Sequence, residues 1–443
     1  MRMRKKTWGA GVVAGAALAT IAGVASATPA AMAAPSRPAT GTAATGPAAT
    51  GTAATSPGGT SSPAGGTLAP PPVTVLTDRG GNGGGDIFIA PYGDSSSYAN
   101  GAEILSPDGK KVVWFHPAPA GEEDADFRTQ TYDGQQVLTF WQGTGLGGVS
   151  TGTDYIYNRH YQQIAAIRAG NGYSADGHEF LITGRNTALI LSYTTATANL
   201  TSIGGPADQA VIDGVVQEVD IKTGKVLFQW NSADHVPYSQ SEQPLPASAS
   251  TPWDWFHVNA VKVNTDGSFL IDARDTWTTY DVSPRTGKIN WRLGGKDSSF
   301  TLKAGAGQVL NDAGDIFAWQ HDVEGHGNGV YTVFDNESAG TGNTGTGASS
   351  ELAYSRAATI KLNLATHTAT LLAADNQPEG LIATSQGNAQ LLPSGDEVVG
   401  WGALPYFSEF SPSGQLEFNA ELPAGVNTYR AYRLPWSPSG PRR

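Results

Sequence analysis

Cysteine is missing from the 443-residue chain. Its absence excludes disulfide bonds, a lipoprotein anchor, a thiolate nucleophile and thiolate metal ligands, so the core alone must stabilise the fold. Basic residues are also few: 27 lysines and arginines stand against 39 aspartates and glutamates, a net charge of −12. This balance argues against nucleic acid or an anionic membrane surface as a partner. An anionic substrate would need a local cluster of arginine and histidine.

The first 72 residues lack the composition of a folded domain. Residues 1–33 combine a basic start, MRMRKK, with an apolar stretch that ends in small residues, and we predict a signal peptide cleaved after Ala33. Its removal would leave 23 basic against 39 acidic side chains, a net charge of −16. Residues 34–72 repeat alanine, threonine, glycine and proline, which predicts a disordered linker. No second long apolar run follows, so we expect a secreted or envelope-associated protein without an integral membrane segment.

Residues 73–443 have the pattern of an all-β domain. Helical periodicity is almost absent, and short apolar or β-branched runs alternate with turns of glycine, aspartate, asparagine and proline. A climbing strand such as DGSFLIDAR and a hairpin such as VQEVDIKTGKVLFQW recur every 40 to 70 residues or so, which predicts a six-bladed β-propeller. Whether the segment near Val73 adds a strand to the closing blade stays open. The expected blades cover residues 84–116, 125–169, 176–231, 254–294, 315–373 and 386–436.

Four residues combine the chemistry of anion capture with equivalent places in this repeat. His178, His257 and His321 lie at or beside expected inner strands, and Arg274 lies near the end of the strand after His257. A neutral imidazole can act as nucleophile or acid–base group, and a guanidinium can hold the oxygens of a sulfate, phosphate or carboxylate. Because inner strands crowd the axis, we expect these side chains to meet at one mouth of a central funnel.

Neighbouring polar residues allow a functional and a structural interpretation. Asn259 is expected to face the same side of its strand as His257 and to donate its amide to an oxyanion. Arg274 needs a partner if it is buried, and Asp272, Asp275 or a bound anion could supply one. A purely structural role therefore stays open, with hydrogen-bonded imidazoles and a salt bridge from Arg274 to Asp272.

Two tryptophans are further candidates for the site, whereas the remaining histidines are expected to lie outside it. Most tryptophans are expected to pack between blades, but Trp277 and Trp319 lie close in sequence to Arg274 and His321 and could bind a planar substrate. The other five histidines are expected on the surface or in loops: His116, His160, His235, His326 and His367.

The candidate residues lie within long sequence motifs. The longest are DWFHVNAVKVNTDGSFLIDARDTWTTYDVSPRTGKINWRLGG and FAWQHDVEGHGNGVYTVFDN, joined by HEFLITGRNTALILSY and YRAYRLPW. In these motifs, which follow one another across most of residues 84–437, the chain resembles the arylsulfotransferase family, in particular its secreted six-bladed propellers. The resemblance implies sulfuryl transfer from a phenolic sulfate ester to a phenolic acceptor through a sulfated histidine, without a nucleotide sulfate donor, cofactor or metal.

The same resemblance assigns roles residue by residue. It implies that His321 is the transient nucleophile, that His178 and His257 support it, that Arg274 binds the sulfate and that Asn259 is the companion amide. Asp275 stands where relatives often have a histidine, which predicts less positive charge beside the anion site.

Two other functions stay open from the residues alone. A metal-dependent hydrolase would use His321, Asp322 and His326 as ligands, since oxygen and imidazole donors suit several divalent ions. A non-catalytic propeller at the cell surface would hold an anionic or aromatic ligand in the same funnel.

Overall fold

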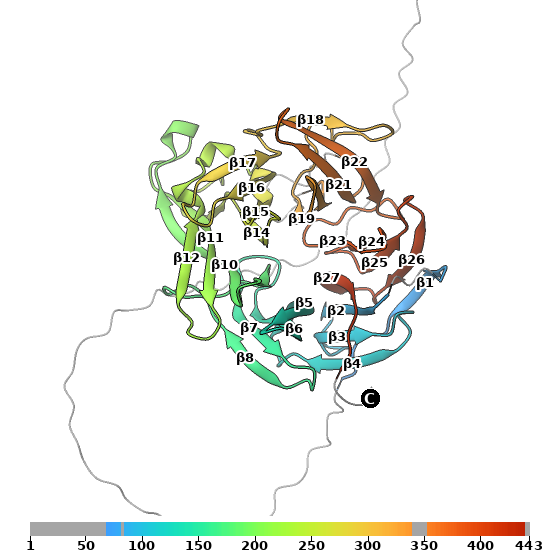
Figure 1. The fold of residues 1–443 in the computed structure, drawn as a ribbon. Coiled ribbons are helices and arrows are strands. Elements are labelled where there is room, and N and C mark those ends of the chain that lie inside the picture. Colours follow the sequence, from blue (N-terminus) through green and yellow to red (C-terminus); the bar gives the residue numbers. More distant parts are fainter. Residues whose placement is uncertain (1–67, 81–83, 339–351, 439–443) are drawn as a thin grey trace, which may run out of the picture. The chain divides into compact units, whose positions relative to one another are not determined.

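Six β-sheets surround a central axis in the computed structural model, which describes residues 68–80, 84–338 and 352–438 (Figure 1). Each sheet forms one blade, and the only helices in the described residues are four short 3₁₀ turns. The predicted all-β propeller with six blades is thus confirmed. The expected signal peptide and all but the last five residues of the expected linker lie outside the described residues. Among the described residues, no helix could span a membrane.

The strands step outward from the axis in every blade. The first blade contains β27 (Val426–Leu434), β2 (Asp86–Gly93), β3 (Gly101–Leu105) and β4 (Val112–Pro117); the second contains β5 (Glu123–Tyr132), β6 (Gln135–Thr144), β7 (Thr151–Tyr157) and β8 (Gln163–Ile167). The third contains β9 (Phe180–Ile182), β10 (Thr187–Ala198), β11 (Gln209–Asp220) and β12 (Val226–Asn231), with β13 (Trp253–Asp254) beside β11.

The other three blades follow the same plan. The fourth contains β14 (Val258–Val263), β15 (Phe269–Ala273), β16 (Thr278–Val282) and β17 (Ile289–Leu293). The fifth contains β19 (His321–Gly327), β20 (Val330–Asp335), β21 (Arg356–Asn363), β22 (Thr368–Asn376) and an outer β18 (Thr301–Ala304). The sixth contains β23 (Asn388–Leu391), β24 (Glu397–Gly400), β25 (Tyr406–Phe410), β26 (Leu416–Glu421) and an outer β1 (Thr74–Asp78).

Strands from both ends of the described chain close the ring. β27 pairs antiparallel with β2 as the innermost strand of the first blade, and β1 pairs antiparallel with β26 as the outermost strand of the sixth. Placing residues 426–434 in the sixth blade was therefore wrong, because their hydrogen-bond partners lie in β2. The open question near Val73 is answered by β1, which begins at the next residue and adds a strand to the closing blade.

Apolar side chains fill the space between neighbouring blades. The largest cluster joins the third and fourth blades, for example Leu191 and Val216 with Phe256 and Ile271. Burial of such side chains contributes about 25 cal/mol per Å² of apolar surface, which accounts for stability without disulfides. The large fully buried tryptophans lie in these clusters: Trp141, Trp230, Trp255 and Trp401.

The innermost strands create two mouths on the axis. We call the end at which these strands begin the entry mouth and the end at which they finish the exit mouth. Residues late in β5, β9, β19, β23 and β27 line one shared cavity at the exit mouth, so these five strands run in the same direction. Residues that precede or open the innermost strands accordingly gather at the entry mouth.

Candidate functional site

Three histidines meet at the entry mouth. His178 lies two residues before β9, His257 lies directly before β14, and His321 is the first residue of β19. The rings of His178 and His257 are perpendicular, with centroids 5.0 Å apart, and both lie close enough to His321 to act on its charge. Because the three residues hold equivalent places in the third, fourth and fifth blades, the structural repeat brings them together.

Arg274 joins the histidines through strand pairing in the fourth blade. It follows β15 as the first residue of the 3₁₀ turn η4 (Arg274–Thr276), and its backbone N–H donates to the carbonyl oxygen of His257 over 3.0 Å. Its side chain is fully buried. The three histidines and the arginine expected to converge therefore form one cluster.

Strained backbone occurs in and beside this cluster. Of the thirteen non-glycine residues with positive φ in the described chain, five belong to the cluster or flank it, namely His257 (φ 49°), Trp277 (φ 50°), Trp319 (φ 57°), Asp322 (φ 56°) and Gln386 (φ 64°). Such conformations cost about 1 to 3 kcal/mol each and persist only where the surroundings fix them. At His257 the strained residue precedes a β-bulge near the start of β14, and bulges re-aim side chains at functional sites.

Each imidazole has its own partner on Nδ1. His178 pairs with Asp176, which lies two residues before it, and His257 pairs with Asp254 over 2.5 Å. The Nδ1 of His321 instead lies 2.7 Å from the amide oxygen of Asn336. Two imidazoles thus face a carboxylate and one faces a neutral amide.

The contacts of Asn336 fix the tautomer of His321. The Nδ2 atom of Asn336 donates to the carbonyl oxygens of Ala383 and Gln386 over 2.9 and 3.0 Å, so its Oδ1 must accept from His321. The proton of the neutral ring therefore lies on Nδ1. The lone pair of Nε2 accepts a hydrogen bond of 3.1 Å from the backbone N–H of Gln386.

These surroundings drive the pKa values of two histidines in opposite directions. Burial lowers the pKa of His321 well below its ordinary value, and the positive charge of Arg274 lowers it further. Burial also opposes the charged form of His257, but the charge and hydrogen bond of Asp254 and the charge of Asp275 outweigh burial and raise its pKa. His321 is thus held neutral and available as a base or nucleophile, while His257 retains a proton to higher pH.

Arg274 is held by three kinds of contact. Its guanidinium donates to Asp275 Oδ1 over 2.8 Å and to the carbonyl oxygen of Thr384 over 3.0 Å, and it lies 5.2 Å above the ring of Trp319. Burial raises the pKa of Asp275 to about 6 despite the opposing charge of Arg274. The salt bridge anticipated for Arg274 therefore forms with Asp275 and not with Asp272.

Asp272 and Asn259 take part in cross-strand hydrogen bonds. Asp272 accepts from Thr279 and from the side chain of Gln320 over 2.7 and 2.9 Å. Asn259 Nδ2 donates to the carbonyl oxygen of Gln320 over 2.6 Å, while its buried Oδ1 has no hydrogen-bond partner among the described residues. Asn259 thus ties β14 to the residue before His321, and the role of its amide as an oxyanion ligand stays a prediction.

Trp277 and Trp319 form a pair beside Arg274. Their rings meet edge to face with centroids 5.4 Å apart, and both side chains are buried. Neither indole N–H has a hydrogen-bond partner within the described residues. The pair therefore offers an apolar surface and two open donors next to the guanidinium, which suits an aromatic molecule that carries an anionic group.

A buried layer of charged groups lies farther along the axis. Arg430 contacts Asp126, Glu179 and Asp322 at 2.9, 3.1 and 3.4 Å, and Lys262 contacts Glu179 and Asp322 at 2.9 and 2.8 Å. Arg128 adds a third cation through Asp126 and Glu179. Asp322 thus belongs to this charge layer, whereas Asn336 is the residue that bonds Nδ1 of His321.

The charge layer separates the histidines from the exit mouth. A cavity of about 610 Å³ opens there, and its lining includes Arg128, Glu324 and His326. His326 bonds Thr332 over 2.8 Å. His321, Asp322 and His326 therefore do not share one metal site. At the entry mouth the histidines are buried, and the side chain of Asp254, 25% exposed, is the part of the cluster nearest to solvent.

Several residues of the site were missed in the sequence. Asp176 and Asp254 lie two and three residues before their histidines, a spacing that could have identified them. Asn336 offers no such signal, since it reaches His321 only through the pairing of β19 with β20. Tyr193 also escaped notice; it lies against the rings of His178 and His257 and donates to the carbonyl oxygen of Val258 over 2.5 Å.

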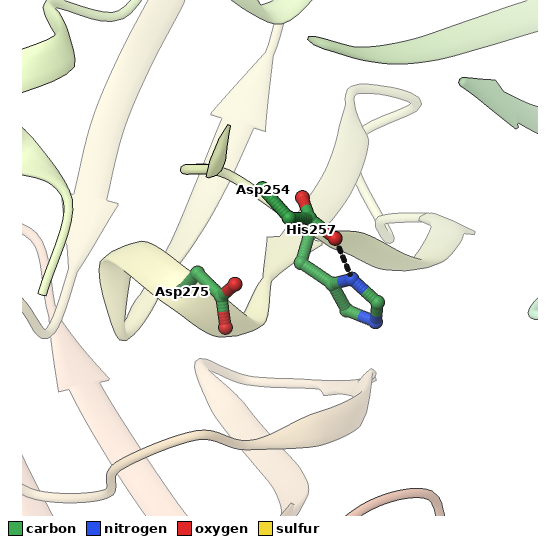
Figure 2. Close-up of side chains that lie close together, drawn as sticks. All are labelled: Asp254, His257 and Asp275. Atoms are coloured by element: carbon green, nitrogen blue, oxygen red, sulfur yellow. Dashed lines mark hydrogen bonds and ion pairs between the residues drawn. The ribbon is translucent and has the colours of Figure 1, made fainter. Parts of the chain in front are cut away.

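One group of side chains has the donors and spacing of a metal site. Ligand atoms of Asp254, His257 and Asp275 all lie within 4.8 Å of one another, and no other such group occurs among the described residues. Figure 2 shows the carboxylate of Asp275 directed toward His257, whose ring is hydrogen-bonded to Asp254. Two carboxylates and an imidazole suit a divalent transition metal.

A family model described as arylsulfotransferase (ASST) matches residues 128–422. A protein of unknown function from Bacteroides caccae shares 13% identity at a TM-score of 0.44, covering 78% of this chain and 98% of that chain. A protein from Lactobacillus plantarum shares 11% identity at a TM-score of 0.36, covering 79% and 99%. No curated protein matches the chain in sequence.

Proposed function

Because the chain belongs to the arylsulfotransferase family, we propose that it moves a sulfuryl group from a phenolic sulfate ester to a phenolic acceptor through a sulfated His321. The observation that carries this proposal is that, within one cluster, the pKa of His321 is lowered while the pKa of His257 is raised. Both histidines lie beside the guanidinium of Arg274. Nucleophile, acid and anion ligand are the three groups that such a transfer needs.

The first half-reaction sulfates the enzyme. The lone pair on His321 Nε2 attacks sulfur, and an N–S bond forms as the bond from sulfur to the aryl oxygen breaks. Arg274 and the free indole N–H groups of Trp277 and Trp319 stabilise negative charge on the sulfuryl oxygens. His257 gives its proton to the departing phenolate.

The second half-reaction returns the enzyme to its starting state. The acceptor hydroxyl loses its proton to His257 while its oxygen attacks sulfur, and the N–S bond to His321 breaks. Asn336 accepts from Nδ1 and, as a neutral amide, does not remove that proton. The sulfated ring therefore stays cationic and departs from sulfur as neutral imidazole, a better leaving group than an imidazolate.

Substrate entry requires the segment 383–387 to move. The backbone N–H of Gln386 donates to His321 Nε2, and the carbonyl oxygen of Thr384 accepts from the guanidinium of Arg274. Both contacts lie where the sulfuryl group would bind. Displacement of this segment would free the nucleophile and leave a backbone N–H available to a sulfuryl oxygen.

The decisive experiment uses p-nitrophenyl sulfate with and without a phenolic acceptor. The proposal predicts p-nitrophenol release that depends on the acceptor, persists in chelator and disappears in His321→Ala. A stoichiometric mass increase of one sulfuryl group on the peptide that contains His321 should be found when the donor is given alone. Full activity of His321→Ala would remove this residue from the mechanism, and acceptor-independent release would indicate a hydrolase.

We also propose that the protein acts outside the cytoplasm, after removal of residues 1–33. The basic start and the apolar stretch of this segment support export. Mass spectrometry of the mature N-terminus in the culture supernatant or envelope fraction tests the proposal, which an intact Met1 in those fractions would contradict.

A further inference from the structure

Asp254, His257 and Asp275 place two carboxylates and an imidazole around one small space beside Arg274 (Figure 2). Their ligand atoms lie within 4.8 Å of one another. A transition-metal ion binds such donors at roughly 2.0 to 2.2 Å, so two ligands of one ion lie at most about 4 Å apart. Only small side-chain movements would bring all three donors onto one ion.

Both carboxylates keep one buried oxygen without a partner. Asp275 is 1% exposed, and while its Oδ1 accepts from Arg274 over 2.8 Å, its Oδ2 has no hydrogen-bond partner among the described residues. Asp254 accepts from His257 through Oδ2, and its Oδ1 likewise has none. A buried acceptor left unpaired destabilises the fold, and coordination to a cation would remove that cost.

From this arrangement we propose that Asp254, His257 and Asp275 bind one divalent transition-metal ion, with Zn²⁺ as the best match. Zinc takes four ligands of oxygen and nitrogen, and three protein ligands leave one position open. Calcium and magnesium prefer six or more ligands and mainly oxygen. The side chain of Asp254, 25% exposed, gives the ion a path from solvent.

Metal binding opposes the reaction described above, and this step rests on the proposed function. A metal-coordinating imidazole nitrogen must be deprotonated. The nitrogen of His257 that holds zinc can therefore neither give a proton to the departing phenolate nor take one from the acceptor. The metal-free protein is the active form, and zinc is an inhibitor that occupies one of the proposed catalytic side chains.

Binding is tested on the metal-free full chain with Zn²⁺ alone, by titration calorimetry and by equilibrium dialysis with metal analysis. We expect one zinc per chain, and at least tenfold weaker binding in Asp254→Asn and in Asp275→Asn. The matched control is Asp208→Asn, an exposed carboxylate. No stoichiometric site in the wild type, or equal affinity in all four proteins, would overturn the proposal. Asp254→Asn alone suffices if Asp275→Asn does not fold.

The inhibitory role is tested separately on the release of phenol from phenyl sulfate, whose leaving group depends on protonation, with a different phenol as acceptor. Zinc should suppress the wild-type rate at the concentration that fills the site, and at least tenfold more zinc should be needed to suppress the residual rate of Asp254→Asn. A wild-type rate that filling of the site leaves unchanged overturns the inhibitory role. A metal-free enzyme without any transfer activity would contradict the proposed function, while the binding measurements would still decide the metal site.

Discussion

His321 donates its Nδ1 proton to the amide oxygen of Asn336 over 2.7 Å, whereas His178 and His257 pair through Nδ1 with the carboxylates of Asp176 and Asp254. A carboxylate stabilises the imidazolium form and an amide does not. The three histidines hold equivalent places in the propeller, but the partner of Nδ1 differs. This partner distinguishes His321, the candidate nucleophile, from the supporting His178 and His257.

The first prediction concerns Asn336→Asp. The new carboxylate should raise the pKa of His321, so the neutral ring would be scarce at neutral pH and the rate should fall at least tenfold. The acidic limb of the pH profile of kcat/KM should move to higher pH, and part of the rate should return in alkaline buffer. Asn328→Asp, at an exposed position, is the control. A uniform loss without a shifted profile would indicate that Asn336 is only structural.

The second prediction concerns Asp254→Asn. Loss of the carboxylate should lower the pKa of His257, so the proton is lost at lower pH and the alkaline limb of the profile shifts downward. General acid catalysis contributes about 10²- to 10⁴-fold. The defect should be large for phenyl sulfate, whose phenolate is basic, and small for p-nitrophenyl sulfate, whose leaving group needs little protonation. Equal losses with both donors would argue against His257 as the acid.

The third prediction separates the two roles of Arg274. Replacement by methionine leaves Asp275 as a buried carboxylate without its cation, and breaking such a pair costs about 3 to 5 kcal/mol. The double variant Arg274→Met with Asp275→Asn should recover most of that stability in urea unfolding. Activity should stay at least 100-fold below the wild type in both proteins, because no group holds the sulfate. Recovery of activity with stability would show that Arg274 is structural.

The fourth prediction concerns the stability of the first blade. Glu103 in β3 is fully buried without a hydrogen-bond partner among the described residues, and burial raises its pKa from 4.5 to about 8. Between these values the unfolded chain loses this proton while the folded chain keeps it, so wild-type stability should fall as the pH rises from 4.5 to 8.

Glu103→Gln removes that pH dependence. The variant should unfold at the same temperature as the wild type near pH 4 and at a progressively higher temperature up to pH 8, measured by calorimetry across the range. The partly exposed Glu417→Gln is the control. A constant difference at every pH would contradict the assignment of a neutral carboxyl group to Glu103.

Local sequence signals predicted the fold and the convergence of the histidines because both follow from the repeat. The innermost strands of a propeller crowd one axis, so His178, His257 and His321, expected at or beside these strands, could be placed together without coordinates. β27 could not be assigned to its blade, because the sequence YRAYRLPW fits the outermost strand of the sixth blade and the innermost strand of the first blade equally well. Its true partner, β2, is more than 300 residues away in sequence.

The partners of the site residues were harder to predict. Asp272 and Asp275 both lie close enough to Arg274 in sequence to form a salt bridge. The 3₁₀ turn η4, which bends the chain directly after Arg274, selects Asp275. Asn336 depends on strand pairing in the fifth blade. The left-handed backbone at Trp277 has no sequence signal of its own, since tryptophan does not favour that conformation.

Closure of the ring by β27 has a consequence for biosynthesis. This strand contains Arg430, which forms ion pairs with Asp126, Glu179 and Asp322 near the axis. It also contains Tyr429, whose ring lies against that of His178. Five blades can be translated before any of these contacts exists. The ring therefore closes only after Val426–Leu434 has been translated, and a nascent chain released before this strand would contain every candidate histidine in a propeller whose first blade lacks its innermost strand.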